Sequence, residues 1–354
     1  MKNMYIIPIF IPHLGCPHKC VFCNQNEITG SKCIIDEEFV NNTIINYLKT
    51  IPTDSRIEVS FYGGSFTGIP IDDQKRYLNI AKKYLDMGEI DAIRLSTRPD
   101  YINDTILTNL KYYGVSIIEL GVQSMDKDVL IKSQRGHTEK DVINASYLIK
   151  KNGFTLGLQM MIGLPGDDEK KAIKTAEKII SLKPDFVRIY PTLVVKGTYL
   201  EKMYKDGLYK PINLNDAVEL SKELYIKFIR NNIDVIRIGL QTTKNINTNG
   251  DIIAGPFHPA FGQLVKSSIV KDMVDNIFYN NNIRDGLVTI YTNPKFVSIV
   301  TGQKKINKKY LEAKYNVYIT IGQKDEVPLD DVCIKFNDNI YSDSLKSFIG
   351  KTTT

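Results

Sequence analysis

Apolar residues in the first two-thirds of the chain occur in two patterns. Short uninterrupted runs rich in β-branched and aromatic residues are typical of buried strands, and the longer segments between them repeat apolar residues at helical spacing. Helices are expected after Asp36, over residues 72–85 and after Asp167. Asp36 and Asp167 are the expected N-caps of the first and third of these helices. Six strands are expected, at residues 4–12, 57–61, 91–96, 116–120, 155–161 and 185–190.

Strands that alternate with helices predict right-handed crossovers and a parallel sheet. Six such units predict an α/β fold, a partial (β/α)6 TIM-like barrel, for residues 1–245. Another strand is expected at residues 234–238, after a helical apolar stripe of Ala217, Leu220, Leu224 and Phe228. Barrels of this kind carry their chemistry at the carboxyl ends of the strands, so the residues that follow the strands are candidate site residues.

From about residue 246 the pattern changes, because Asn and Gly become frequent and the alternation of strand and helix stops. The stretch 249–263 is rich in turn formers and aromatic residues, and both a linker and a flap over the open side of the barrel are open interpretations. A small α+β appendage over residues 246–354 is predicted from strand-like runs at 288–291, 296–300, 315–321 and 332–336.

Composition excludes few function classes. The chain of 354 residues has 43% hydrophobic and 24% charged residues, which is typical of a soluble globular protein. Its longest apolar runs are strand-sized, so no membrane span is expected, and without a signal peptide a cytoplasmic location is expected. The net charge of +6 permits a nucleic-acid partner without requiring one. One basic cluster is interpreted either as an RNA contact or as a solvated face: Lys304, Lys305, Lys308 and Lys309.

Candidate chemistry begins with the cysteines. Three of the five follow the first expected strand in C-x3-C-x2-C spacing: Cys16, Cys20 and Cys23. Three thiolates on one loop suit a soft metal centre. A closed zinc site needs a fourth ligand, which His13 or His18 could supply, whereas an iron-sulfur cubane with one open iron needs only three cysteines. Both interpretations stay open on the residues alone. Cys33 and Cys333 stand apart and are expected to be buried or incidental thiols.

The cysteine spacing resembles that of the radical S-adenosylmethionine (SAM) enzymes, in which three cysteines hold a [4Fe-4S] cluster whose fourth iron chelates SAM. Phe22, the aromatic residue before the third cysteine, and the turn Gly63-Gly64 after the second strand also fit this family. The resemblance implies that Phe22 lies against the adenine and that the glycine turn contacts the methionine amino group. Glycine permits such a backbone contact because it has no Cβ.

Four longer motifs, at residues 61–67, 96–101, 119–124 and 188–194, are similar to the radical domain of the catalytic subunit of Elongator. That family modifies wobble uridine in tRNA. The resemblance implies reductive cleavage of SAM to a 5′-deoxyadenosyl radical, hydrogen abstraction in tRNA uridine modification, and an external electron donor of the flavodoxin or ferredoxin class. Oxygen-independent coproporphyrinogen oxidases share some motifs, so a small-molecule substrate is one alternative. A non-catalytic iron-sulfur or zinc module that binds RNA is another.

The same resemblance assigns site residues. The implied metal ligands are Cys16, Cys20 and Cys23, and Tyr190 is expected to face the substrate. The implied cofactor-binding residues are Phe22, Gly63, Gly64, Ser96, Gln123, Arg135 and Gln159. The Elongator subunit usually has Glu where this chain has Ser96. Its N-terminal RNA-binding segment and acetyltransferase domain have no counterpart here, so acetyl transfer by this chain alone is not expected.

Overall fold

The computed structural model describes residues 3–11, 16, 19–23, 36–240 and 250–351. The chain divides into two compact units. Unit 1 comprises Met1–Asn213 and Ile233–Phe257, and unit 2 comprises Leu214–Asn232 and His258–Thr354. The expected boundary between residues 245 and 246 remains a prediction about where the functional barrel ends.

Unit 1 is built on one sheet of seven parallel strands in the order β1-β2-β3-β4-β5-β6-β8. Neighbours in the sheet follow one another along the chain, as repeated βα crossovers produce. This confirms the α/β class and the partial TIM-like barrel, and the expected strand at 234–238 is its seventh member. The strands are β1 (Asn3–Ile11), β2 (Ser55–Gly63), β3 (Ala92–Thr97), β4 (Val115–Gln123), β5 (Thr155–Ile162), β6 (Phe186–Pro191) and β8 (Asp234–Ile238).

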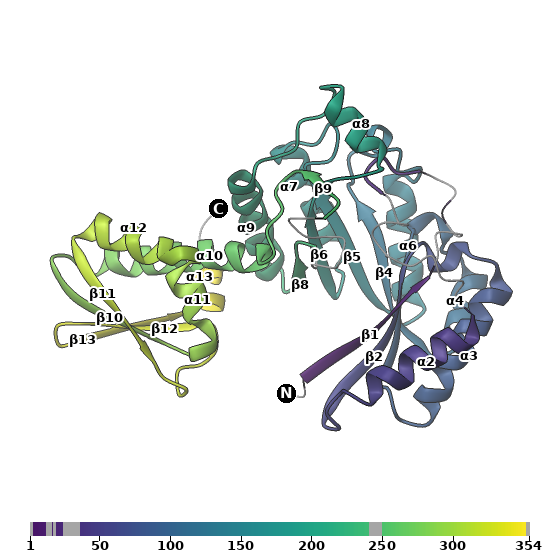
Figure 1. Ribbon diagram of the computed structural model, residues 1–354, viewed down its shortest axis with the longest axis horizontal. Coiled ribbons are helices and arrows are strands. Elements are labelled where there is room, and N and C mark those ends of the chain that lie inside the picture. The colour runs from purple at the N-terminus through teal and green to yellow at the C-terminus, as the bar shows by residue number, and fades with distance from the viewer. Residues whose placement is uncertain (1–2, 12–15, 17–18, 24–35, 241–249, 352–354) are drawn as a thin grey trace. The chain divides into compact units, whose positions relative to one another are not determined.

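Helices connect these strands, and Figure 1 shows α2, α3 and α4 together along one side of the sheet. Short helical turns follow β2 and β3, at Phe66–Gly68 and Pro99–Tyr101. A two-stranded antiparallel pair joins β7 (Val194–Val195) to β9 (Ile252–Ala254). The helices in the described part of unit 1 are α2 (Glu37–Leu48), α3 (Ile71–Asp86), α4 (Asp104–Tyr112), α5 (Lys127–Lys132), α6 (Glu139–Lys151), α7 (Glu169–Ser181) and α8 (Tyr199–Lys205).

Two expected N-caps have different outcomes. The Asp36 side chain accepts a hydrogen bond from the Phe39 backbone N–H and caps α2, as predicted. The prediction for Asp167 was wrong, because Asp168 caps α7 by accepting from the Lys171 backbone N–H. Asp167 instead accepts from the backbone N–H of Gly163 at 2.9 Å and so closes the preceding loop. Adjacent aspartates are equally suited to capping, and the loop geometry decides between them.

Unit 2 combines a four-stranded sheet with helices. Its strands are β10 (Gly286–Thr292), β11 (Val317–Gln323), β12 (Asp331–Phe336) and β13 (Asn339–Ser344), in the order β11-β10-β12-β13. β10 and β11 are parallel, and the other pairs are antiparallel. The helices are α9 (Leu214–Arg230), α10 (Phe261–Asn280), α11 (Val297–Thr301), α12 (Ile306–Tyr315) and α13 (Leu345–Lys351).

One expected strand of the appendage was wrong. Residues 296–300 lie in a short turn, Pro294–Phe296, and in α11, because Asn293 accepts from the Lys295 backbone N–H and Pro294 begins the turn. A short apolar run does not distinguish strand from helix by its periodicity. Strand β13 and the helices α10, α12 and α13 were not predicted from the sequence. The described part of 249–263 contributes β9 and the start of α10. In the described part of the chain, no helix is long and apolar enough to cross a membrane.

Candidate functional site

A cavity of about 380 Å³ lies at the carboxyl ends of the strands of unit 1. Gly63 and Gln123, the last residues of β2 and β4, both line it. Every described residue that the sequence assigned to cluster, cofactor or substrate lines this one cavity: Cys16, Cys20, Phe22, Cys23, Gly63, Gly64, Ser96, Gln123, Arg135, Gln159 and Tyr190. The fold thus brings all eleven together, and their individual roles remain predictions. His13, His18 and Cys33 lie outside the described residues.

The cysteine loop is attached to the barrel on two sides. The Val21 backbone N–H donates to the Ser133 carbonyl at 3.1 Å, and the Val21 carbonyl accepts from the Leu200 N–H at 2.7 Å. The Val21 side chain is fully buried in a small apolar cluster beside α8, against which Phe22 packs. These contacts hold residues 20–23 against α8 and against the segment between α5 and α6.

The thiols of this loop lie near two arginines. Cys16, Cys20 and Cys23 are free thiols, and the Arg135 Nη1 atom lies 3.5 Å from the Cys20 sulfur. Burial raises the pKa of the Cys16 thiol, and Arg135, the backbone N–H of Ser65 and Arg98 offset only part of this rise. Within the described ranges, no three Cys, His, Asp or Glu side chains are grouped to hold a single metal ion.

Arg98 and Arg135 each carry a buried N–H that lacks a hydrogen-bond partner among the described residues: Nη1 of Arg98 and Nε of Arg135. An unpaired buried donor costs about 1–3 kcal/mol, and more when the group is charged. The rest of each guanidinium is fixed, Arg98 by a bidentate pair with Asp100 and Arg135 by the Gly121 carbonyl at 2.6 Å. Two oriented cations with free donors, in a cavity that also holds three thiols, fit a group that is anionic and bound by thiolates.

The Gly-Gly turn depends on its first glycine. Gly63 has φ +103°, and a Cβ at this position would lie 2.6 Å from the Ile11 carbonyl oxygen. No other residue is accommodated there without moving β1 or β2. Hydroxyl groups join this turn to the end of β3, because the Thr97 Oγ1 atom lies 2.7 Å from Ser65 Oγ and 2.6 Å from Thr67 Oγ1.

The end of β4 is irregular at the cavity. The pairing with β5 shifts register between Gly121 and Gln123, and Gln123 adopts a left-handed φ of 65°. Such backbone conformations in residues other than glycine are concentrated at functional sites. The side-chain oxygen of Gln123 accepts a hydrogen bond from Gln159 Nε2 at 3.3 Å, so two predicted cofactor-binding residues are in contact. Gly121 also lines the cavity but was not predicted as a site residue. A Cβ at Gly121 would lie 2.7 Å from Arg135 Nη2, so only glycine leaves room for this guanidinium.

A buried chain of ion pairs crosses the barrel below these loops. Arg94 lies 2.7 Å from Glu58 and 3.3 Å from Glu119, and the Arg188 Nε atom lies 2.6 Å from Glu119. The four side chains come from β2, β3, β4 and β6. Glu119 and Arg188 each begin one of the four motifs, but neither was predicted as a site residue. Charged residues inside otherwise apolar strands were the signal that could have identified them.

Glu119 and Arg188 line the cavity, together with Tyr62 and Tyr190. Arg188 donates to the Tyr62 hydroxyl at 3.0 Å and to the Tyr190 hydroxyl at 3.3 Å. Burial opposes the charge of Arg188, but Glu119 and the two tyrosines outweigh burial and raise the pKa of the guanidinium above its usual value. Arg188 therefore stays charged and holds both phenol groups in place at the cavity wall.

The loop after β5 contains a second hydrogen-bonded set of residues, centred on Gly163. The Tyr209 hydroxyl donates to the Gly163 carbonyl at 2.5 Å, and the Gly163 N–H donates to Asp167. Burial raises the pKa of the Asp167 carboxyl to about 7, although the backbone N–H groups of Gly163 and Asp168 oppose the rise. Asp167 is therefore a titratable group near neutral pH whose ionisation this loop resists.

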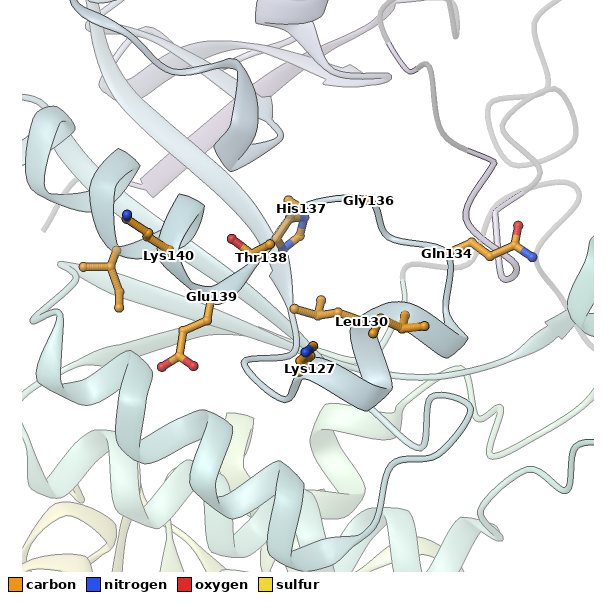
Figure 2. A pocket seen from close by; sticks show the side chains of 10 residues that line it. Lys127, Leu130, Gln134, Gly136, His137, Thr138, Glu139 and Lys140 are labelled. Carbon is orange, nitrogen blue, oxygen red and sulfur yellow. The ribbon is translucent and has the colours of Figure 1, made fainter.

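A larger cavity, of about 660 Å³, lies elsewhere on unit 1 between α5 and α6 (Figure 2). Figure 2 shows Lys127 and Leu130 from α5, Glu139 and Lys140 from α6, and His137 between the helices. None of the described cysteines lines it. The smaller cavity is the candidate site, because it combines the thiols, the arginines and the strained strand end.

Comparison with known sequences identifies the class of protein. The model of the Radical SAM superfamily matches residues 10–179, and that of the Radical_SAM C-terminal domain matches residues 184–271. The chain therefore belongs to the radical SAM superfamily, whose enzymes use a [4Fe-4S] cluster and SAM.

The chain is also similar to individual proteins of known sequence and structure. The tRNA uridine(34) acetyltransferase of Methanocaldococcus jannaschii is 30% identical over 65% of this chain and 50% of its own length. Human Elongator complex protein 3 is 32% identical over 47% of this chain and 34% of its own. The chain thus spans about half or less of these relatives. The structure of Methanocaldococcus infernus Elp3 with an N-terminal deletion shares the fold, with a TM-score of 0.61 and 24% identity over 80% of this chain and 69% of that one.

Proposed function

We propose that this chain is a radical SAM enzyme that cleaves SAM reductively and acts on a uridine of tRNA. The observation that carries the radical SAM part is the single cavity that collects the three cysteines, the glycine turn and two arginines with unpaired buried donors. The tRNA part is supported by the names of the relatives, which describe enzymes acting on tRNA uridine(34).

Cys16, Cys20 and Cys23 would hold the [4Fe-4S] cluster, and Gly63, Gly64, Ser96, Gln123, Gln159 and Phe22 would contact SAM. Once bound and given an electron by the external donor, the cluster and SAM would supply a 5′-deoxyadenosyl radical for hydrogen abstraction. Arg135, which lines the cavity, would contribute its positive charge beside the Cys20 sulfur and a buried Nε–H that has no partner among the described residues. The proposal includes an external electron donor of the flavodoxin or ferredoxin class. It also includes a cytoplasmic location, with which the free thiols agree.

The chain's own polar groups suit the recognition of a uracil ring. Arg188 has only donors, so Tyr62 and Tyr190 accept from it, and the proton of each phenol remains able to donate. Uracil presents carbonyl oxygens that accept such bonds. Glu119 fixes Arg188 through two short contacts and so fixes both tyrosines. We assign substrate positioning to this group. The proposal covers the radical step within residues 10–271, where the family models match.

The test begins with anaerobic reconstitution of the full chain. About four irons per chain are expected, and their loss is expected when Cys16, Cys20 or Cys23 is changed to Ser. Cys333→Ser is the matched control and should retain iron, because Cys333 lies on β12 in unit 2. A chain that retains its iron in all three variants would exclude the assigned ligands.

Turnover then tests the substrate. With dithionite as reductant, the loaded protein should form 5′-deoxyadenosine from SAM. Deuterium should pass from uridine-deuterated tRNA into 5′-deoxyadenosine if tRNA is the hydrogen donor. Formation of 5′-deoxyadenosine that is neither stimulated by tRNA nor deuterated would keep the radical SAM chemistry and overturn the tRNA substrate, leaving the small-molecule alternative.

A further inference from the structure

The four-stranded sheet of unit 2 has one buried and one exposed face. Alternate side chains along its strands are buried, as the period of two residues requires: Val288, Ile290, Ile319, Val332 and Ile334. The side chains between them lie on the opposite face, where Leu287, Tyr318 and Ile340 are each more than 60% exposed. We name this surface the open face and define it by Leu287, Tyr291, Tyr318, Thr320, Lys335 and Ile340.

Two tyrosines of the open face are held against neighbouring groups. A Cβ on Gly322 would lie 2.4 Å from the Tyr291 ring, so this ring lies directly over the backbone of β11. The Lys324 Nζ atom lies 4.2 Å from the centroid of the Tyr291 ring. The Tyr318 ring has the Lys308 Nζ atom 5.1 Å from its centroid. Tyr318 therefore combines an exposed ring with a nearby cation, whereas the half-buried Tyr291 ring lies between the β11 backbone and Lys324, which a stacked base would displace.

The two rings are spaced along adjacent strands. Tyr318 pairs with Leu287, which lies four residues before Tyr291 on β10. At about 3.3 Å per residue, the rings are offset along the strands by about 13 Å. Lys335, on the other side of β10, pairs with Thr289 between the two positions. The open face thus presents two separated aromatic rings with three lysines on or beside it.

We propose that the open face binds single-stranded RNA, with bases stacked on Tyr291 and Tyr318 and phosphates beside Lys308, Lys324 and Lys335. This inference rests on the proposed function, because it assigns a further contact to the tRNA substrate. Exposed aromatic residues on a four-stranded sheet stack unpaired bases in known RNA-binding modules, and such stacking tolerates any base. Lysines beside the rings complement the phosphate charge.

The charged side chains of the open face limit the path of the bound RNA. Asp331 belongs to the same row of β12 as Lys335 but lies at the opposite end, next to Asp330. Asp330 and Asp343 lie beside Asp331 and, after burial, contribute to the raised pKa of its carboxyl, so three acidic side chains are gathered at that end. The RNA is therefore expected to cross the end that carries Tyr318 and Lys335 and to stop before Asp331. Of the basic cluster at residues 304–309, Lys308 is the member that reaches an aromatic ring of this face.

The experiment measures binding of labelled RNA to the full chain by fluorescence anisotropy. The probes are an anticodon stem-loop RNA, an oligouridine and a fully paired duplex. Tyr318→Ala and Tyr291→Ala should each weaken binding of both single-stranded probes about 5- to 150-fold, the range for loss of one stacked base. Tyr318→Phe should retain affinity, because stacking uses the ring and not the hydroxyl.

Two comparisons separate stacking from charge. Tyr279→Ala, on α10 and similarly exposed, is the matched control and should bind as the wild type does. Lys335→Ala should reduce the slope of log affinity against log salt by about 0.7, the value for one single-strand phosphate contact. Tyr318→Ala should leave that slope unchanged. Circular dichroism should show all variants folded, because Tyr318, Tyr279 and Lys335 are exposed and Tyr291 is only half-buried.

The results distinguish failure of the open-face proposal from failure of the proposed tRNA substrate. If the wild type binds both single-stranded probes but the Tyr291 and Tyr318 variants bind equally well, the open face is overturned while the proposed function stands. If the wild type binds neither probe yet still cleaves SAM, both the open face and the tRNA substrate are overturned. Equal binding of the duplex would exclude base stacking. A dimer in the wild type that Tyr318→Ala dissociates would show instead that the open face joins two copies of this chain.

Discussion

Changing Glu119 to Gln should destabilise unit 1 strongly, because it leaves Arg188 as a buried charge without its counter-ion. Glu119 and Arg188 are only 5% and 11% exposed at their side chains, and three contacts of 2.6–3.3 Å join Glu119 to Arg188 and Arg94. Arg94 keeps Glu58 as a partner at 2.7 Å, so Arg188 is the group that loses its charge partner.

Removal of one member of a buried ion pair costs about 3–5 kcal/mol. For a unit of this size the corresponding fall in Tm is about 6–20 °C. The hydroxyls of Tyr62 and Tyr190 still accept from Arg188 but carry no charge, so they do not replace the carboxylate. The double variant Glu119→Gln with Arg188→Gln should recover much of the loss, because neither remaining amide is charged.

Urea unfolding followed by circular dichroism measures both effects. Asp86→Asn is the matched control: it removes an exposed ion pair of 2.9 Å with Lys82 on α3 and should change the free energy of unfolding by less than about 0.5 kcal/mol. The reasoning would be refuted if Glu119→Gln cost less than about 1 kcal/mol, or if the double variant were less stable than Glu119→Gln alone.

Three further changes test the cavity. Gly63→Ala should cost about 1–3 kcal/mol in strain at φ +103° and more from contact with the Ile11 carbonyl; unchanged urea unfolding and unchanged SAM affinity would contradict this. Because burial raises the pKa of Asp167 from 3.8 to about 7, the wild type should lose stability relative to Asp167→Asn as pH rises from about 4 to about 7, whereas parallel unfolding profiles would exclude the shift. Gly121→Ala should displace Arg135 and weaken SAM binding measured by calorimetry, with wild-type affinity as the refuting result.

Much of the site was predictable because its signals are local. The C-x3-C-x2-C spacing, the Gly63-Gly64 turn and the position of Gln123 at a strand end depend on neighbouring residues alone. Parallel βα order then requires that the strand ends meet at one edge, so the sequence predicted a common site as well as its members. The confirmed partial barrel follows from the same alternation.

Other features depend on which residues meet across the fold. Gly121 gains its role only because Arg135, fourteen positions later, brings its guanidinium over the glycine. Glu119 pairs with Arg94 and Arg188 and Arg94 pairs with Glu58, so this chain of ion pairs joins strands β2, β3, β4 and β6, and no local pattern gives such a register. Residues 296–300 became helical because their apolar residues fit either period and the fold selected one.

The sequence by itself therefore determined the βα order, the thiol loop and the glycine turn, since each follows from local spacing and backbone sterics. Only the tertiary structure decided that Arg98 and Arg135 carry unpaired donors at the cavity and that Glu119 holds Arg188. Tertiary structure also decided that one face of the small sheet in unit 2 remains exposed. The physical reason is that burial and charge pairing are properties of distant residues brought together, and a linear pattern does not contain their distances.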